Sequence, residues 1–383
     1  MRILLVEDDA DKAKTITALI AKELDTDQVE LIQVATVNDA FVRISEGRYD
    51  LVIVDLVLPQ VNGGNAIDAT SQWCELIENH LAGRTASWIV MTGYAEIVDG
   101  AQQSFARHNV AVIPYDSSGV WQLSLTAKLR DTYTTRPLDF LVICALEKER
   151  RGFEYADCVL GQKEIVSGLD SQPVTIGALR GAIVVQPNPG MISAAIVTTS
   201  AVSVFRPRAV AMSGICGGRE GESELGALIV PDVSWNYQAG KFKDGKLTAD
   251  LLQVLVPPNV RTQLSQLANN EQSAAVRKGL MFSDLARAPI SLAPMVSGSQ
   301  VVADASVSAT IGDQGRKVAG IDMEVASVYF AAREFFDGGG IYFAAKAVVD
   351  LADPNKGDHY HEYGCAVAAR FVANALKDLL AKP

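Results

Sequence analysis

Polar side chains follow several apolar segments in the first third of the chain. They are Asp8 and Asp9 after residues 2–6, Asp55 after residues 51–54, and Thr92 after residues 88–91. An open α/β sheet places its site at the carboxyl ends of its strands. Carboxylates gathered there repel one another unless a cation joins them, and a ligand set of oxygen atoms favours Mg²⁺. An aspartate beside Mg²⁺ can accept a phosphoryl group, because the metal offsets the incoming negative charge.

A second group of candidate residues lies further along the chain. Glu149 follows the apolar residues 139–145, and Asp350 ends the apolar residues 341–349. Between them, the glycine-rich residues 214–218 (GICGG) are expected to form a turn in which the backbone can approach a ligand closely. Glu324 precedes a largely apolar helix. Together these features place three acids and a glycine-rich segment around one site.

Glu324 has two interpretations from its own surroundings. An acid at a helix N-terminus can cap the free N–H groups, and a carboxylate at the start of a buried helix can instead receive sugar hydroxyls. Glu149, the GICGG segment and Asp350 supply the site that the second interpretation needs. We therefore expect Glu324 to bind substrate and Asp322 to cap the helix.

Apolar strands alternate with helical segments along the whole chain, which predicts an α/β fold with two domains. In residues 1–132 the continuous apolar strands predict a parallel five-stranded sheet covered on both faces. A helix is expected over about residues 120–130, and the polar, Pro-terminated segment after it predicts a linker at residues 133–138. Residues 139–383 form the second α/β domain, with a central mixed sheet.

Composition excludes several classes of function. The 383 residues carry a net charge of −11, which argues against nucleic acid or an anionic membrane surface as a partner. We find no apolar run of about 18 residues and no signal peptide. The scattered cysteines are typical of reduced thiols, so a cytoplasmic protein is expected.

The first domain resembles the response-regulator receiver family, through VEDD (residues 6–9), VDLVLP (54–59) and MTGY (91–94). The resemblance implies a flavodoxin-like fold with Asp55 as phosphoacceptor. Asp8, Asp9 and Asp55 would bind Mg²⁺, Thr92 would be the switch hydroxyl, and a sensor histidine kinase would be the partner. The family carries a Lys just before the Pro that follows the fifth strand, and this chain has Ile113 there. A constitutive pseudo-receiver is the alternative.

The second domain resembles the nucleoside phosphorylase superfamily, and within it the methylthioadenosine/S-adenosylhomocysteine nucleosidases. The ordered set ALEKE (145–149), GICGG, GALIVPD (226–232), SGS (297–299), DMEVAS (322–327) and AVVDLAD (347–353) carries the resemblance. ALEKE stands where phosphorylases of the superfamily have a phosphate-binding loop. The resemblance therefore favours water over phosphate as the acceptor.

The resemblance also implies roles for individual residues. Asp350 would protonate the purine leaving group, and Glu149 would activate water. Glu324 would accept ribose hydroxyls, with Met323 packing on the sugar. Gly217 of the glycine-rich segment and Val302 at a base-stacking position complete the implied substrate-binding set.

Departures from the family pattern alter the base pocket. Val301 and Val302 fill the positions that Phe and Ile hold in the nucleosidases. Ser299 replaces the acid of the SGD motif, Lys346 takes a position where the superfamily has an Arg or similar group, and Val349 replaces the polar residue before Asp350.

The resulting hypothesis is a response regulator whose output domain hydrolyses the N-glycosidic bond of a purine nucleoside. The output domain is expected to need no cofactor, and the resemblance implies a homodimer. The alternatives are a non-catalytic nucleoside-sensing module and a phosphate-dependent phosphorylase.

Overall fold

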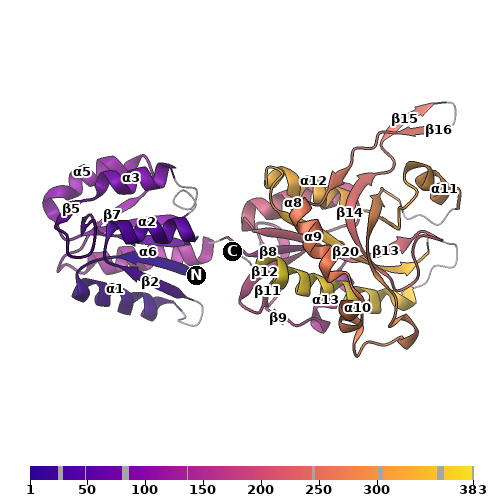
Figure 1. Cartoon of the computed structure of the whole chain (residues 1–383), viewed down its shortest axis with the longest axis horizontal. Helices are drawn as coiled ribbons and strands as arrows, with labels where there is room; N and C mark the ends of the chain where they lie inside the picture. The colour runs from indigo at the N-terminus through magenta and orange to yellow at the C-terminus, as the bar shows by residue number, and fades with distance from the viewer. Residues whose placement is uncertain are drawn as a thin grey trace. The chain divides into compact units, whose positions relative to one another are not determined.

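The computed structural model describes residues 1–24, 29–47, 49–79, 86–135, 137–243, 246–300, 305–351 and 358–381. The chain forms two compact units, Met1–Arg136 and Pro137–Pro383 (Figure 1). No helix among the described residues is long and apolar enough to cross a membrane.

A parallel sheet of five strands forms the centre of the first unit, in the order β2-β1-β3-β6-β7. Every neighbouring pair is parallel, which confirms the prediction made from the apolar runs. The strands are β1 (Arg2–Val6), β2 (Glu30–Val34), β3 (Leu51–Val54), β6 (Ser87–Thr92) and β7 (Ala111–Pro114). The short strands β4 (Val57–Pro59) and β5 (Ala66–Asp68) pair as a separate antiparallel hairpin directly after Asp55.

Helices cover both faces of this sheet, because each strand is apolar on both sides. Helices α1 (Ala10–Glu23) and α6 (Val120–Thr135) pack on one apolar cluster. Helices α2 (Val37–Glu46), α3 (Thr70–Asn79) and α5 (Ala95–Ala106) pack on the other. Helix α6 runs five residues beyond the expected end near residue 130, so the expected linker at 133–138 begins inside a helix.

The second unit is built on a mixed sheet of eleven strands. The strands are β8 (Phe140–Cys144), β9 (Val159–Leu160), β10 (Glu164–Val166), β11 (Leu169–Ile176), β12 (Leu179–Val185), β13 (Ala209–Gly218), β14 (Leu228–Asn236), β17 (Val254–Leu255), β18 (Ile290–Ser297), β19 (Gly320–Asp322) and β20 (Ile341–Asp350). A hairpin of β15 (Gly240–Lys243) and β16 (Lys246–Ala249) extends from it.

Part of this sheet closes on itself. Strand β13 pairs with β19, β19 with β18, β18 with β14, β14 with β20, and β20 again with β13. This closed, barrel-like arrangement brings the end of β13 together with β19 and β20, although β13 ends about a hundred residues before either of them begins.

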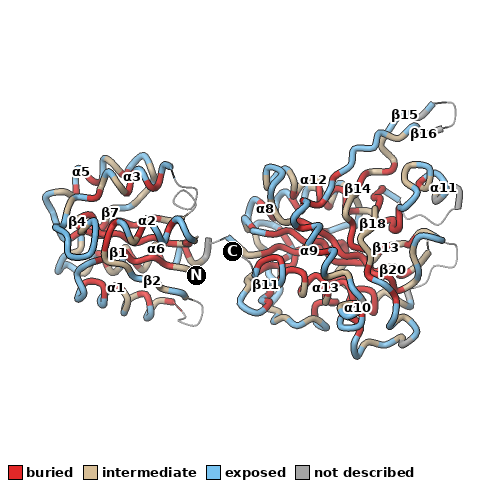
Figure 2. Tube along the Cα trace, viewed as in Figure 1, coloured by how far each residue is buried: buried red, intermediate tan, exposed pale blue. Residues whose placement is uncertain are grey.

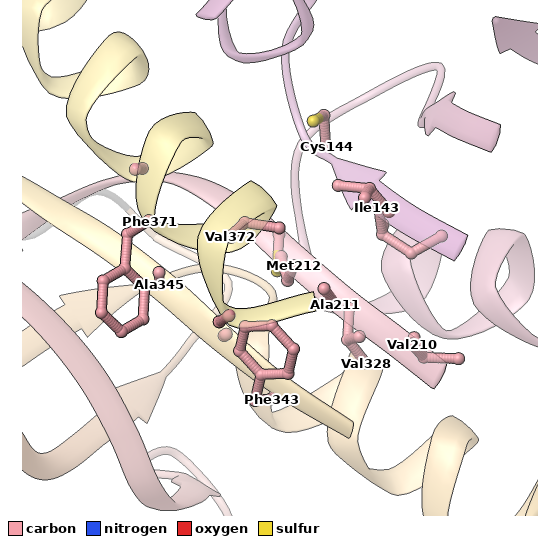
Figure 3. Close-up of a cluster of buried hydrophobic side chains, with 14 of the residues drawn as sticks. Ile143, Cys144, Val210, Ala211, Met212, Val328, Phe343, Ala345, Phe371 and Val372 are labelled. Atoms are coloured by element: carbon pink, nitrogen blue, oxygen red, sulfur yellow. The ribbon is translucent and has the colours of Figure 1, made fainter. Parts of the chain in front are cut away.

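Helices and apolar side chains surround the closed sheet. The helices are α7 (Glu147–Arg151), α8 (Met191–Phe205), α9 (Pro258–Leu267), α10 (Asn270–Arg277), α11 (Ala305–Gln314), α12 (Val325–Phe335) and α13 (His361–Leu380), with short 3₁₀ turns at Gly152–Tyr155, Ser283–Leu285 and Asp358–Tyr360. The sheet strands are buried along most of their length (Figure 2). In the core, side chains from β8, β13, β20, α12 and α13 meet, among them Met212, Phe343 and Phe371 (Figure 3).

Candidate active site

Glu149 is held in one orientation by the backbone. It lies in α7, just after β8, and its side chain is buried. Its Oε2 accepts hydrogen bonds from the backbone N–H groups of Ala145 (2.7 Å) and Leu146 (3.0 Å). Its Oε1 accepts one from the N–H of Ile215 (3.0 Å) on β13. These three bonds fix the carboxylate between the end of β8 and strand β13.

The GICGG segment is part of a strand, and the expected turn is wrong. Strand β13 continues through Gly218, pairing first with β20 and then with β19. The need for glycine lies at Gly214, where an added Cβ would stand 2.1 Å from the Oε1 atom of Glu149. The absence of a side chain at Gly214 makes room for the carboxylate of Glu149. The sequence analysis had instead predicted that the glycines make room for a ligand.

A buried lysine on β20 lies among three carboxylates. The Nζ atom of Lys346 is 3.3 Å from Asp322 Oδ2, 3.5 Å from Glu324 Oε2 and 4.0 Å from Glu149 Oε1. Within the described part of the chain, this ammonium has ion pairs but no hydrogen bond of regular geometry. Burial alone would lower the pKa of Lys346, but the three carboxylates raise it above its ordinary value. Lys346 is therefore a permanent cation at this site.

Asp322 caps helix α12, as expected. Its carboxylate accepts the N–H of Val325 (3.0 Å) and the hydroxyl of Ser297 (2.6 Å). The Ser297 oxygen in turn accepts the N–H of Ala326 (2.9 Å). This network satisfies N–H groups in the first turn of α12, so Glu324 does not have to cap the helix.

Glu324 is buried and its carboxylate faces the cluster. Its Oε1 accepts the N–H of Gly190 (2.8 Å), which stands directly before α8. Burial raises the pKa of Glu324 to about 7, Lys346 acts in the opposite direction, and Asp322 and Glu149 add to the rise. Glu324 therefore gains or loses a proton near neutral pH.

Asp350, Met323 and Val302 are the other residues predicted for this site. Asp350 ends β20 and is in register with Gly217 on β13. Met323 is half-buried between Asp322 and Glu324. Val302 lies outside the described residues. The structure thus brings Glu149 and Glu324 around one ammonium, with Asp350 at the end of the strand that carries it.

The sequence analysis named Lys346 only as a departure from the family pattern, and it assigned no role to Gly190 or Ser297. Lys346 is the one charge within the apolar run IYFAAKAVV, which is a signal for a paired, buried cation. Gly190 and Ser297 act through a backbone N–H and a helix cap, and only the folded chain shows these contacts.

An acid pocket also exists in the first unit. Oxygen atoms of Glu7, Asp8 and Asp55 lie within 4.8 Å of one another, a donor set that suits a divalent cation. Asp9 is not in this group, and its prediction as a metal ligand stays a prediction. Its Oδ1 accepts the N–H groups of Asp11 (2.9 Å) and Lys12 (3.0 Å) and caps α1. Glu7, which the sequence prediction left out, is the third acid of the group.

The remaining predicted residues of this pocket lie at neighbouring strand ends. Thr92 is buried at the end of β6, and its hydroxyl accepts the N–H of Tyr94 (3.3 Å). Ile113 on β7 is buried in an apolar cluster. The ammonium at this site comes from Lys12 on α1, which forms ion pairs with Glu7 and Asp55.

Comparison with known proteins places the second unit in a family. The sequence profile described as "Phosphorylase superfamily" matches residues 139–381. The chain belongs to the phosphorylase superfamily. Across nearly its whole length (99%) it is also 26% identical to all of the uncharacterized protein y4jS from Sinorhizobium fredii.

Relatives within the superfamily include nucleosidases. A death domain-containing ATP nucleosidase from Amphimedon queenslandica is 24% identical over 64% of this chain, and the match spans 49% of that protein. The ATP nucleosidase Cap17 from Escherichia coli is 22% identical over 52% of this chain, and the match spans 42% of that protein.

Solved structures show the same fold. The 5'-methylthioadenosine/S-adenosylhomocysteine nucleosidase from Neisseria meningitidis matches with a TM-score of 0.51 and 17% identity, over 62% of this chain and 98% of that chain. Futalosine hydrolase from Helicobacter pylori matches with a TM-score of 0.52 and 15% identity, over 64% and 99%.

Proposed function

We propose that the second unit hydrolyses the N-glycosidic bond of a purine nucleoside or of its phosphorylated forms. The observation that carries the proposal is the buried cluster in which Glu149, Asp322 and Glu324 surround Lys346. Three carboxylates against one ammonium leave the cluster negative when all are ionised. Cleavage of an N-glycosidic bond builds positive charge on the ribose, and a fixed negative site stabilises that charge.

Glu149 is the proposed group that holds the attacking water. A carboxylate offers about four acceptor positions, and three backbone N–H groups use three of them. One position on the carboxylate is then left for a water molecule. The three backbone hydrogen bonds prevent rotation of the Glu149 carboxylate. A water molecule bound to it would therefore be held in one orientation.

Glu324 is the proposed ligand of the ribose hydroxyls, with Met323 packing on the sugar face. The Gly190 N–H holds Oε1 of Glu324, while Oε2 faces Lys346. An ionised carboxylate accepts hydroxyl hydrogen bonds more strongly than a neutral acid. Asp350 is the proposed general acid toward the purine, and its place at a strand end next to Gly217 supports this role.

The names of the relatives widen the substrate class. Proteins named ATP nucleosidase, 5'-methylthioadenosine/S-adenosylhomocysteine nucleosidase and futalosine hydrolase stand among the similar proteins. The purine glycoside is therefore the proposed common element, and the substituent at the ribose 5' position is the variable one.

The test is a release assay for free base with adenosine, methylthioadenosine, AMP and ATP, each with and without phosphate. We expect phosphate-independent release from at least one of them, and loss of release in Asp350→Asn. Ribose 1-phosphate formed only with phosphate would identify a phosphorylase instead. Tight binding with no release from any compound would identify a sensing module.

For the first unit we propose a receiver function with Asp55 as phosphoacceptor and Thr92 as the switch hydroxyl. The strand order β2-β1-β3-β6-β7 supports this proposal, because it brings Glu7, Asp8 and Asp55 to one sheet edge. Mg²⁺ held by these three acids would offset the charge of a phosphoryl group. The partner would be a sensor histidine kinase.

Labelling with a small phosphodonor tests this proposal. We expect labelled wild-type protein and no label in Asp55→Ala, whereas an unlabelled wild type identifies a pseudo-receiver. We also propose a homodimer, which light scattering of the full chain can refute.

A further inference from the structure

We propose that Lys12 is a built-in cation of the acid pocket in the first unit and competes with a divalent metal for the same carboxylates. The Nζ atom of Lys12 lies 2.7 Å from Glu7 Oε2 and 2.7 Å from Asp55 Oδ2. Glu7 and Asp55 are two of the three acids that would hold the metal. The proposal concerns metal affinity alone, so it holds whether or not Asp55 receives a phosphoryl group.

The donor capacity of Lys12 is fully used inside the pocket. An ammonium has three hydrogens to donate, and three acceptors are in reach: Glu7, Asp55 and the backbone carbonyl of Met91 (3.0 Å). The Lys12 ammonium also lies 5.4 Å from the centre of the Tyr115 ring, within the range of a cation–π contact. The side chain is buried, so water does not compete for these contacts.

The start of helix α1 places Lys12 for this role. The Asp9 carboxylate accepts the backbone N–H of Lys12, which fixes the first turn of α1 directly after Glu7 and Asp8. Lys12 therefore belongs to the same short segment as two of the acids that it could neutralise. Ile113, at the position where the receiver family has its lysine, contributes no charge.

The electrostatic consequence is competition between the two cations. A metal ion that binds Glu7, Asp8 and Asp55 could take the carboxylate oxygen atoms that now contact the Lys12 ammonium, which would break those ion pairs. If it binds the other oxygen atoms instead, it lies a few ångströms from the positive charge of Lys12. Like charges at that separation repel strongly in a buried site. Removal of the Lys12 charge should therefore tighten metal binding.

The experiment titrates Mn²⁺ and Mg²⁺ into the full chain by calorimetry, with wild type, Lys12→Met and Lys14→Met. Lys14 is exposed on the same helix, so its variant loses the same charge outside the pocket. We expect at least tenfold tighter Mn²⁺ binding in Lys12→Met and less than a twofold change in Lys14→Met. Equal or weaker binding in Lys12→Met overturns the proposal.

A second variant, Lys12→Gln, keeps a hydrogen-bond donor in the pocket without the charge. If either Lys12 variant unfolds in EDTA and Mg²⁺ restores its circular dichroism spectrum, the metal has replaced the lost cation and the proposal is supported. If both variants stay unfolded with Mg²⁺, Lys12 has a structural role only and the proposal fails. No nucleoside or phosphodonor is present, so the outcome is independent of the proposed function.

Discussion

Glu324→Gln should change the stability of the second unit in a pH-dependent way. Burial raises the pKa of Glu324 from its ordinary value of 4.5 to about 7. Because each pKa unit corresponds to about 1.4 kcal/mol, ionising this buried side chain lowers the free energy of unfolding by about 3 kcal/mol. Glutamine resembles the neutral acid and does not ionise.

The direction of the effect follows from proton binding. Below pH 4.5 the acid is protonated in both the folded and the unfolded chain, so pH has no effect through this group. Between pH 4.5 and 7 the folded protein binds more protons, and the stability of the wild type falls as pH rises. Above pH 7 the full penalty is present. Relative to the wild type, Glu324→Gln should therefore gain about 3 kcal/mol between pH 4.5 and pH 8.

Hydrogen exchange read by mass spectrometry can measure this difference in peptides from β13 and β20. Comparing variant and wild type at each pH cancels the intrinsic pH dependence of exchange. The exposed Glu154→Gln in the same unit is the matched control and should show no pH-dependent difference. A Glu324→Gln difference that stays constant from pH 4.5 to pH 8 would refute the assigned burial and charge environment.

Three further substitutions test the cluster. In Gly214→Ala, a Cβ atom 2.1 Å from Glu149 Oε1 must displace the carboxylate; we expect about 100-fold slower base release, with about 1–3 kcal/mol lost in urea unfolding. Lys346→Met leaves three buried carboxylates without their cation; the unfolding free energy at pH 7 should fall by about 3–5 kcal/mol, with partial recovery at pH 5 as Glu324 protonates. Ser297→Ala removes a hydroxyl that joins Asp322 to α12; thermal unfolding should show a loss of about 1–2 kcal/mol with little change in kcat.

The architecture of the first unit could be predicted from its sequence because its strands are apolar on both faces. Each run, such as residues 51–54, is short, continuous and followed by polar residues. This pattern is typical of a parallel sheet that is covered by helices on both faces. The closed sheet of the second unit could not be predicted in this way. Its closure depends on pairing between β13, β19 and β20, and no local periodicity encodes which distant strands pair.

The acids of the site were predictable where they stand beside an apolar strand or helix, and contacts made by the backbone were not. Glu149 and Glu324 were named from their positions, and the structure brings both to one ammonium. The GICGG segment was misassigned because glycine is typical of turns, whereas Gly214 is needed within a strand for contact with Glu149. The helix-capping contacts of Asp9 could not be predicted, because adjacent acids are indistinguishable until one of them is seen to cap a helix.

Among the described residues, each unit holds one buried lysine that is surrounded by acids. The two clusters differ in how many carboxylates face the ammonium. In the first unit, Lys12 pairs with Asp55 and with Glu7, and burial raises the pKa of Glu7 to about 7. The buried part of that pocket is therefore close to neutral without a metal. In the second unit, three carboxylates face Lys346. Even with Glu324 protonated, two further carboxylates face the one ammonium, which supports the proposed stabilisation of a cationic ribosyl group at this cluster.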